Sequence, residues 1–257
     1  MFQLEIRKLC LSFRGLRALS DVSFGLEKGL LYSIIGPNGA GKTSLLNCIN
    51  SFYHPESGEI LYEGSTINGL KSHEIAKRGI ARTFQNIELF GGMPVIDNIK
   101  LGRHLLMKSG PFSSCLYLGR ARREEVDHRK HIEEKIIDLL ELEDIRHELV
   151  GMLPYGLQKR VELGRALAME PKILLLDEPT GGMNIEETED MVRYILLIRK
   201  NWDLTTVLIE HDMKVVMDIS DRVVVLNFGI KIAEGSPEHV MKDPAVIDAY
   251  LGKKRRW

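Results

Sequence analysis

The apolar residues of this chain include three short continuous runs. Residues 31–35, 173–176 and 205–209 carry almost no polar alternation. This pattern is typical of strands that are buried on both faces of a parallel sheet. Helical spacing follows elsewhere: residues 43–49 favour a helix after the first run, and residues 186–199 form an amphipathic helix. The alternation predicts an α/β fold with a mainly parallel central sheet.

Three other segments depart from this alternation. Residues 58–62 precede a Glu63-Gly64 turn and, with the residues around them, predict antiparallel β structure. Residues 223–233, interrupted by a turn at 227–229, predict a hairpin near the C-terminus. Residues 120–143 are highly charged, and we expect a separate helical lobe there because apolar side chains recur at helical spacing. Those side chains are Ile132, Ile136, Leu139 and Leu140.

Composition narrows the class of protein. The chain has 257 residues, 44% of them apolar, and a net charge of −1. A packed core is therefore expected, and a dedicated nucleic-acid binder is not, because such proteins carry a basic excess. No apolar run approaches the roughly 20 residues that a transmembrane helix needs. If the protein works at a membrane, a partner must hold it there.

A phosphate-binding loop follows the first buried run. Its glycines let successive N–H groups point at one phosphate, and the next helix aims its positive end at the same anion. Lysine can reach the β- and γ-phosphates, while the threonine hydroxyl suits Mg²⁺. We also place the following residue among the ATP contacts. These residues are Gly36, Pro37, Asn38, Gly39, Ala40, Gly41, Lys42, Thr43 and Ser44.

Two carboxylates end the second buried run. Asp177 and Glu178 follow residues 173–176, and open α/β sheets bind ligands at the carboxyl ends of their strands. We expect Asp177 to hold Mg²⁺ opposite Thr43. Glu178, one residue on, is expected to orient and polarise the water that attacks ATP.

His211 and Gln85 are further candidates. His211 follows the third buried run, which makes a contact with the γ-phosphate plausible. The Gln85 amide could ligate Mg²⁺ or a water. Each residue type is more often structural than catalytic when it is considered alone.

Together these motifs resemble the ATP-binding subunits of ABC transporters, in order and over nearly the whole chain. The resemblance implies an ABC ATPase fold in a single domain, 1–257, with a P-loop NTPase core (1–90 and 166–257), an antiparallel β subdomain and a helical subdomain (91–165). It also implies a dimer in which each ATP lies between one subunit's phosphate loop and the other's signature segment.

The resemblance assigns roles residue by residue. Phe13 would stack on adenine, Gln85 would couple the γ-phosphate to a membrane subunit, Glu178 would be the general base and His211 a γ-phosphate contact. The signature segment, usually Leu-Ser-Gly-Gly-Gln, would contact the partner's ATP. It corresponds to Leu153, Pro154, Tyr155, Gly156 and Leu157.

Two residues depart from the family pattern. Pro154 replaces the serine whose hydroxyl would reach the partner's γ-phosphate, so we expect a weakened contact that relies on the helix N-terminus. Asn184 replaces an aspartate, which removes a charge but keeps hydrogen bonding. The second change puts communication between the two sites in doubt.

A finer resemblance is to the ATPases of branched-chain amino acid importers. It rests on the Leu-Pro-Tyr-Gly segment, an insert at about 102–130, residues 210–214 and the ending at 249–252. This resemblance implies permease subunits, an indirect contact with a substrate-binding protein, a second ATP-binding subunit (identical or different) and a place at the cytoplasmic face of the cell membrane. ATPases of urea or amide importers and of lipopolysaccharide export are similar, and a soluble ABC ATPase is a more distant alternative.

Overall fold

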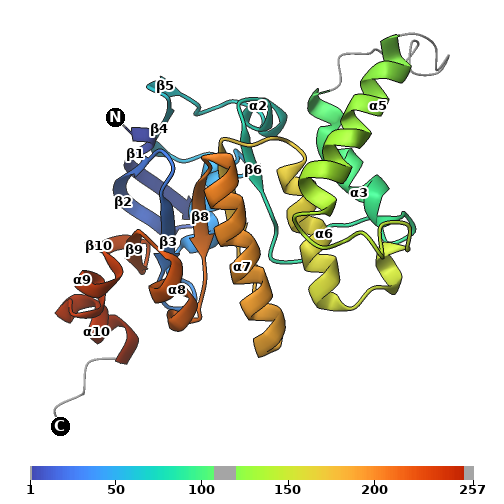
Figure 1. Cartoon of the computed structure of the whole chain (residues 1–257). Coiled ribbons are helices and arrows are strands. Elements are labelled where there is room, and N and C mark those ends of the chain that lie inside the picture. The colour runs from blue at the N-terminus through green and yellow to red at the C-terminus, as the bar shows by residue number, and fades with distance from the viewer. Residues whose placement is uncertain (1, 107–119, 252–257) are drawn as a thin grey trace.

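The computed structural model describes residues 2–106 and 120–251, so parts of the 102–130 insert and of the 249–252 ending lie outside the described residues. Two sheets lie at one end of the molecule, and the helices α3, α5 and α6 are grouped at the other (Figure 1). The long helix α7 lies between the central sheet and α6. This arrangement confirms the predicted fold class.

The antiparallel sheet has the strand order β2-β1-β4-β5. The central sheet has the order β10-β9-β3-β8-β7-β6, in which every neighbouring pair is parallel except β9 with β10. The strands are β1 (Phe2–Phe13), β2 (Leu16–Glu27), β3 (Leu31–Ile35), β4 (Ser57–Tyr62), β5 (Ser65–Thr66), β6 (Ile80–Arg82), β7 (Ile173–Asp177), β8 (Thr205–Ile209), β9 (Arg222–Asn227) and β10 (Ile230–Gly235).

The helices connect and cover the two sheets. The α-helices are α1 (Lys42–Ile49), α2 (Ser72–Lys77), α3 (Val95–Gly102), α5 (Arg120–Ile132), α6 (Tyr155–Leu167), α7 (Ile185–Trp202), α8 (Met213–Ile219), α9 (Pro237–Met241) and α10 (Pro244–Leu251). Short 3-10 helices occupy Arg103–Leu106 and Val150–Met152, and a π-helical turn occupies Glu133–Ile137.

The three predicted buried strands are confirmed as β3, β7 and β8, and every residue in them is buried. The C-terminal hairpin is confirmed as β9 and β10. The paired strands β1 and β2, which the sequence pattern did not indicate, run for 12 residues each. Register shifts and left-handed residues such as Lys8 and Asp21 interrupt their alternation, because each bulge moves the following side chains to the other face.

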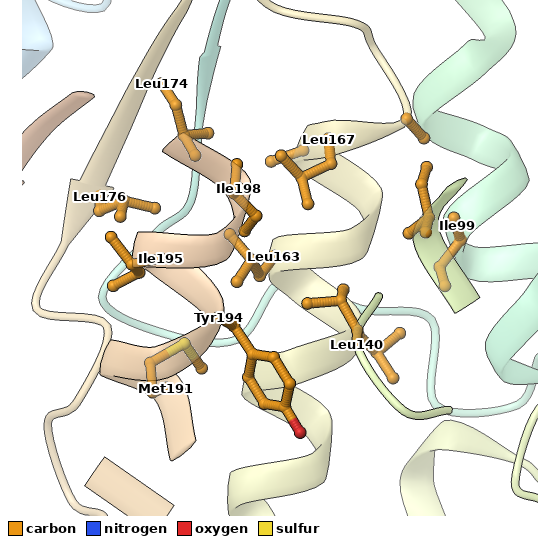
Figure 2. Close-up of a cluster of buried hydrophobic side chains, with 14 of the residues drawn as sticks. Ile99, Leu140, Leu163, Leu167, Leu174, Leu176, Met191, Tyr194, Ile195 and Ile198 are labelled. Atoms are coloured by element: carbon orange, nitrogen blue, oxygen red, sulfur yellow. The ribbon is translucent and has the colours of Figure 1, made fainter. Parts of the chain in front are cut away.

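One continuous core joins the helical lobe to the sheet. In Figure 2, Leu174 and Leu176 of β7 lie near Ile195 and Ile198 of α7, and Leu163 and Leu167 of α6 lie beyond them. The helix predicted over 120–143 is present as α5 and the π-helical turn that follows it, and ends at Ile137. Of the side chains at helical spacing, Ile132, Ile136 and Leu140 are fully buried and Leu139 is partly buried. The boundaries at residues 90 and 165 stay a prediction.

Candidate functional site

The phosphate loop bends where β3 leaves the sheet. Gly36 has φ 149°, and a Cβ there would lie 2.0 Å from the carbonyl oxygen of Leu226. Gly41 has φ 103°, and its Cβ would lie 2.6 Å from the carbonyl oxygen of Ala18. Only glycine combines these dihedrals with such close backbone approach. Gly36 and Gly41 are therefore required by the lack of space for a side chain as well as by the backbone turn.

Lys42 begins α1 and points back into the loop. Its Nζ donates to the carbonyl oxygens of Gly36, at 2.7 Å, and Pro37, at 3.2 Å. Burial lowers the pKa of Lys42, although Glu178 and Asp177 act in the opposite direction. The ammonium group thus already lies within the loop whose phosphate it is expected to bind.

Two C-terminal segments contact the phosphate loop, and the sequence motifs indicated neither contact. The backbone N–H of Gly229, in the β9–β10 turn, donates to the carbonyl of Ala40 at 3.0 Å. Burial raises the pKa of Tyr250, in α10, and the nearby backbone N–H of Gly36 lowers it to a smaller extent. Both contacts join residues about 190 or more positions apart in sequence, which is beyond the reach of local pattern.

Three predicted catalytic residues meet at one carboxylate. Gln85 Nε2 donates to Glu178 Oε2 at 3.0 Å, and His211 Nε2 lies 2.5 Å from Glu178 Oε1. The three residues follow β6, β7 and β8, three adjacent parallel strands. Glu178 has φ 51°, and its N–H donates to the carbonyl of Ile209. The carboxyl ends of β7 and β8 therefore converge as expected, and β6, which the sequence pattern did not indicate, brings Gln85 to the same edge of the sheet.

Asp177 has a partner that the sequence did not suggest. Arg82, at the end of β6, donates to Asp177 Oδ2 at 2.7 Å, and both side chains are buried. The same guanidinium donates to Asn47 Oδ1 at 2.6 Å. Within the described ranges, no hydrogen-bond partner reaches Asp177 Oδ1. One carboxylate oxygen is thus held by arginine, and the other keeps its capacity to bind.

A cleft of about 710 Å³ lies over the loop. Its lining includes most of the phosphate loop together with the cluster around Glu178 and part of β2. Lining residues are Leu16, Arg17, Ala18, Asn38, Gly39, Ala40, Gly41, Lys42, Thr43, Ser44, Gln85, Glu178, His211 and Phe228.

The chemistry of the predicted Mg²⁺ ligands can be tested against this geometry. Thr43 and Gln85 both line the cleft, and Asp177, which is buried and not among the lining residues, has one oxygen, Oδ1, without a described partner. Oxygen donors of these three kinds suit Mg²⁺. The donor types present therefore fit the ion, and Asp177 would have to reach it from below the lining of the cleft.

Phe13 does not line the cleft. It ends β1, is 41% exposed, and packs edge-on against Tyr53 with the ring centroids 4.9 Å apart. Leu16, Arg17 and Ala18, which follow it along the same hairpin, do line the cleft. The predicted role of Phe13 in stacking on adenine stays a prediction.

The signature segment lies outside this cleft. Leu153 is buried, Pro154 is the residue before the first turn of α6, and Tyr155 is exposed at its start. No described side chain caps this helix end. Gly156 packs against α7, where a Cβ would lie 2.4 Å from Glu187 Oε1.

Asn184, one of the departures from the family pattern, caps α7. Its Oδ1 accepts the N–H of Glu187 at 2.9 Å, and Glu187 Oε2 accepts the N–H of Asn184 at 3.0 Å. This reciprocal pair satisfies two of the N–H groups at the helix start. The amide therefore serves the helix end without needing the charge of an aspartate.

Across residues 2–106 and 120–251, no helix is both long and apolar enough to span a membrane.

The family model described as "ABC transporter" matches residues 19–181. A second model, described as "Branched-chain amino acid ATP-binding cassette transporter", matches residues 231–255.

Similar proteins cover nearly the whole chain. The high-affinity branched-chain amino acid transport ATP-binding protein BraF of Pseudomonas aeruginosa is 40% identical over 97% of this chain and 98% of its own length. LivG of Escherichia coli, described in the same words, is 41% identical with the same coverage. A nucleotide-free ATP-binding cassette from an ABC transporter matches with a TM-score of 0.84 and 30% identity, over 98% of this chain and 100% of that one. A cassette in its ADP conformation gives the same values.

Proposed function

The chain belongs to the ABC transporter ATP-binding family, whose activity is ATP hydrolysis, and from this premise we propose that it powers the import of branched-chain amino acids through partner membrane subunits. The substrate class follows from similarity to BraF and LivG and from the second family model at the C-terminus. We assign the cleft over the phosphate loop as the ATP site.

The observation that carries hydrolysis is the convergence of Gln85 and His211 on Glu178 beside Lys42. Glu178 is the general base: it takes a proton from the attacking water as the water oxygen bonds to the γ-phosphorus. The bond to the β–γ bridging oxygen breaks, and ADP leaves with that electron pair. Gln85 and His211 orient the carboxylate for this transfer.

The loop binds the phosphates. Its backbone N–H groups and the Lys42 ammonium offset the negative charge on the β- and γ-phosphates. Thr43, Gln85 and Asp177 would hold Mg²⁺, which when bound neutralises phosphate charge. Arg82 fixes the Asp177 carboxylate through one oxygen, so that the other points in a defined direction.

The other half of each working site comes from a second ATP-binding subunit, identical or different. The start of α6 carries uncapped N–H groups and the exposed ring of Tyr155, and these groups lie outside the chain's own cleft. Unsatisfied N–H groups at a helix N-terminus bind anions. In the dimer, they would face the γ-phosphate on the partner's loop.

Permease subunits hold the chain at the cytoplasmic face of the cell membrane, and a substrate-binding protein acts through them. Exposed aromatic side chains near residues 84–90 favour such docking. Phe52 packs edge-on against Phe84, with the ring centroids 5.9 Å apart, and both Phe52 and Phe90 are more than half exposed. Exposed aromatic rings of this kind mark protein–protein contacts.

The test is uptake of labelled leucine, isoleucine and valine by cells that lack this chain. Wild-type chain is expected to restore uptake, and Glu178→Gln is not. Membrane proteins that co-purify with a tagged chain would identify the permeases. Restored uptake of urea instead, or rescue of an outer-membrane lipopolysaccharide defect, would contradict the proposed substrate but leave the ATPase assignment intact.

A further inference from the structure

Residues 84–88, here named the glutamine loop, leave the central sheet directly after β6. The last sheet-type bond runs from the Thr83 N–H to the carbonyl of Leu175, at 2.9 Å. Beyond that point the backbone of the loop is bonded by side chains of α6, the helix that begins at the signature segment. The position of the loop is therefore set by hydrogen bonds to α6 more than by hydrogen bonds to the sheet.

The contacts come from one face of α6. Lys159 Nζ donates to the carbonyl oxygens of Phe84, at 3.0 Å, and Gln85, at 2.8 Å. Glu162 Oε1 accepts the Phe84 N–H at 3.1 Å, and the Arg165 guanidinium donates to the carbonyl of Glu88. Positions three apart share a helical face, so the three charged side chains meet the loop together.

Two of these charges are deeply buried. The Lys159 and Glu162 side chains are each 2% exposed, and Lys159 Nζ lies 3.4 Å from Glu162 Oε2. A buried ion pair is tolerated only when hydrogen bonds satisfy its remaining donors and acceptors. The backbone of Phe84 and Gln85 supplies those bonds. If the loop left α6, the two buried charges would keep each other but lose the backbone groups that satisfy them.

Gln85 is thus bonded at both ends. Its backbone carbonyl is held by Lys159 of α6, and its side-chain amide donates to Glu178. We infer that Lys159, Glu162 and Arg165 are positioning residues, which make the contact between Gln85 and Glu178 depend on where the signature helix lies. This inference rests on the proposed function, because it acts through Gln85 and Glu178.

The coupling runs from the signature segment to the catalytic carboxylate. When the partner's phosphate binds at the start of α6, it shifts the helix as a unit. The glutamine loop moves with the helix, because the buried side chains of α6 are hydrogen-bonded to its backbone. Each subunit would then adjust its own carboxylate according to whether its signature segment is occupied. Lys159 also lies 5.9 Å from the ring of Tyr155, the first residue of α6, so the chain of contacts begins at the signature segment itself.

A double-mutant cycle tests this coupling. The kcat and KM for MgATP are measured for wild type, Lys159→Met, Gln85→Ala and the double variant. We expect Lys159→Met to lower kcat about 10-fold with little change in KM, and to have no further effect when Gln85 is already alanine, because coupled residues are not additive. Lys159→Arg should recover most of kcat. The control is Lys172→Met, which removes an exposed lysine whose carboxylate partner, Glu63, is also exposed.

Amide exchange gives a second readout. Glu162→Ala removes the acceptor of the Phe84 N–H, whereas Glu162→Gln keeps an oxygen there. Exchange in residues 84–88 should therefore quicken in the first variant and stay closer to wild type in the second. If Lys159→Met does not fold, Arg165→Gln replaces it in the kinetic cycle, because Arg165 is only partly buried.

The outcomes separate the two proposals. If Gln85→Ala alone leaves kcat unchanged, the role of Gln85 in the proposed function fails, and this inference fails with it. If Gln85→Ala lowers kcat and Lys159→Met lowers it by the same further factor in both backgrounds, only the inference is overturned. Unchanged amide exchange in Glu162→Ala would also overturn it.

Discussion

The phosphate-loop cleft and the signature segment are built in opposite ways. In the cleft, charged groups are already bonded within the chain: Lys42 to loop carbonyls, Glu178 to Gln85 and His211. At the signature segment, the start of α6 has no described side-chain cap, and the ring of Tyr155 is exposed. The first region is preorganised by its own chain, while the second offers groups that only another molecule can satisfy.

This difference supports the proposal that one chain binds ATP but needs a second for efficient turnover. Preorganised donors act on a ligand without further ordering. An uncapped helix end contributes only when an anion is brought to it. Changes in the cleft should therefore alter chemistry and affinity strongly, whereas changes at the signature segment should act through the dimer and be smaller.

The largest effect is expected from Glu178→Gln, which removes the proton acceptor and keeps the shape of the side chain. Turnover should fall about 100-fold or more, the usual contribution of a general base, while ATP still binds. Steady-state phosphate release and nucleotide titration measure the two quantities. The bound ATP should also stabilise a dimer, visible by sedimentation. Normal ATPase activity in this variant would remove Glu178 from the mechanism.

Lys42→Ala should weaken nucleotide binding about 10- to 100-fold, because a hydrogen bond to a charged group contributes about 1.5–3 kcal/mol. Calorimetric titration of ATP into the monomeric chain measures this loss. Lys28→Ala is the matched control, since that lysine is exposed and paired with the exposed Asp203. Equal affinity of wild type and Lys42→Ala would show that the backbone of the loop suffices.

Pro154→Ser addresses the other region. The added hydroxyl should tighten the ATP-bound dimer by about 0.5–1.5 kcal/mol, a net gain typical of one hydrogen bond. Sedimentation of the Glu178→Gln background with ATP gives the dimer Kd. Pro154→Ala separates the hydroxyl from the loss of the proline ring. If the serine and alanine variants dimerise alike, the helix N-terminus alone makes the contact.

The smallest effect is expected from Asn184→Asp. Asparagine and aspartate cap helices about equally well, so the free energy of unfolding should change by less than about 0.5 kcal/mol, whereas Asn184→Ala should cost about 1 kcal/mol. Denaturant unfolding measures both. A large change in Asn184→Asp would mean that the charge, and not the cap, decides the conformation of this segment.

The central strands and the phosphate loop were predictable because their signals are local. The apolar run of β3 ends at Gly36, and the glycine spacing and Lys42 follow within eight residues. The meeting of Glu178 and His211 also followed from a topological rule, since each side chain comes after a predicted parallel strand. The strand that precedes Gln85, β6, was not predicted from the sequence.

The partners of these residues were not predictable. Arg82 reaches Asp177 across 95 positions, and Lys159 reaches the Gln85 carbonyl across 74. No periodicity connects residues so far apart, and an arginine after a short strand looks like any other surface charge. Folding decides such pairs, because a buried charge must find whichever opposite charge or carbonyl the packing brings near it.

The contact of Lys42 with the carbonyls of Gly36 and Pro37 makes nucleotide binding an exchange of partners. In the proposed site, the Lys42 ammonium would exchange hydrogen bonds to these carbonyls, and not to water, for bonds to the phosphate. Measured binding enthalpy therefore reports the difference between two sets of hydrogen bonds, and a modest value is compatible with a strong contact. A binding enthalpy measured for this site therefore includes the cost of breaking the hydrogen bonds that Lys42 makes within the loop.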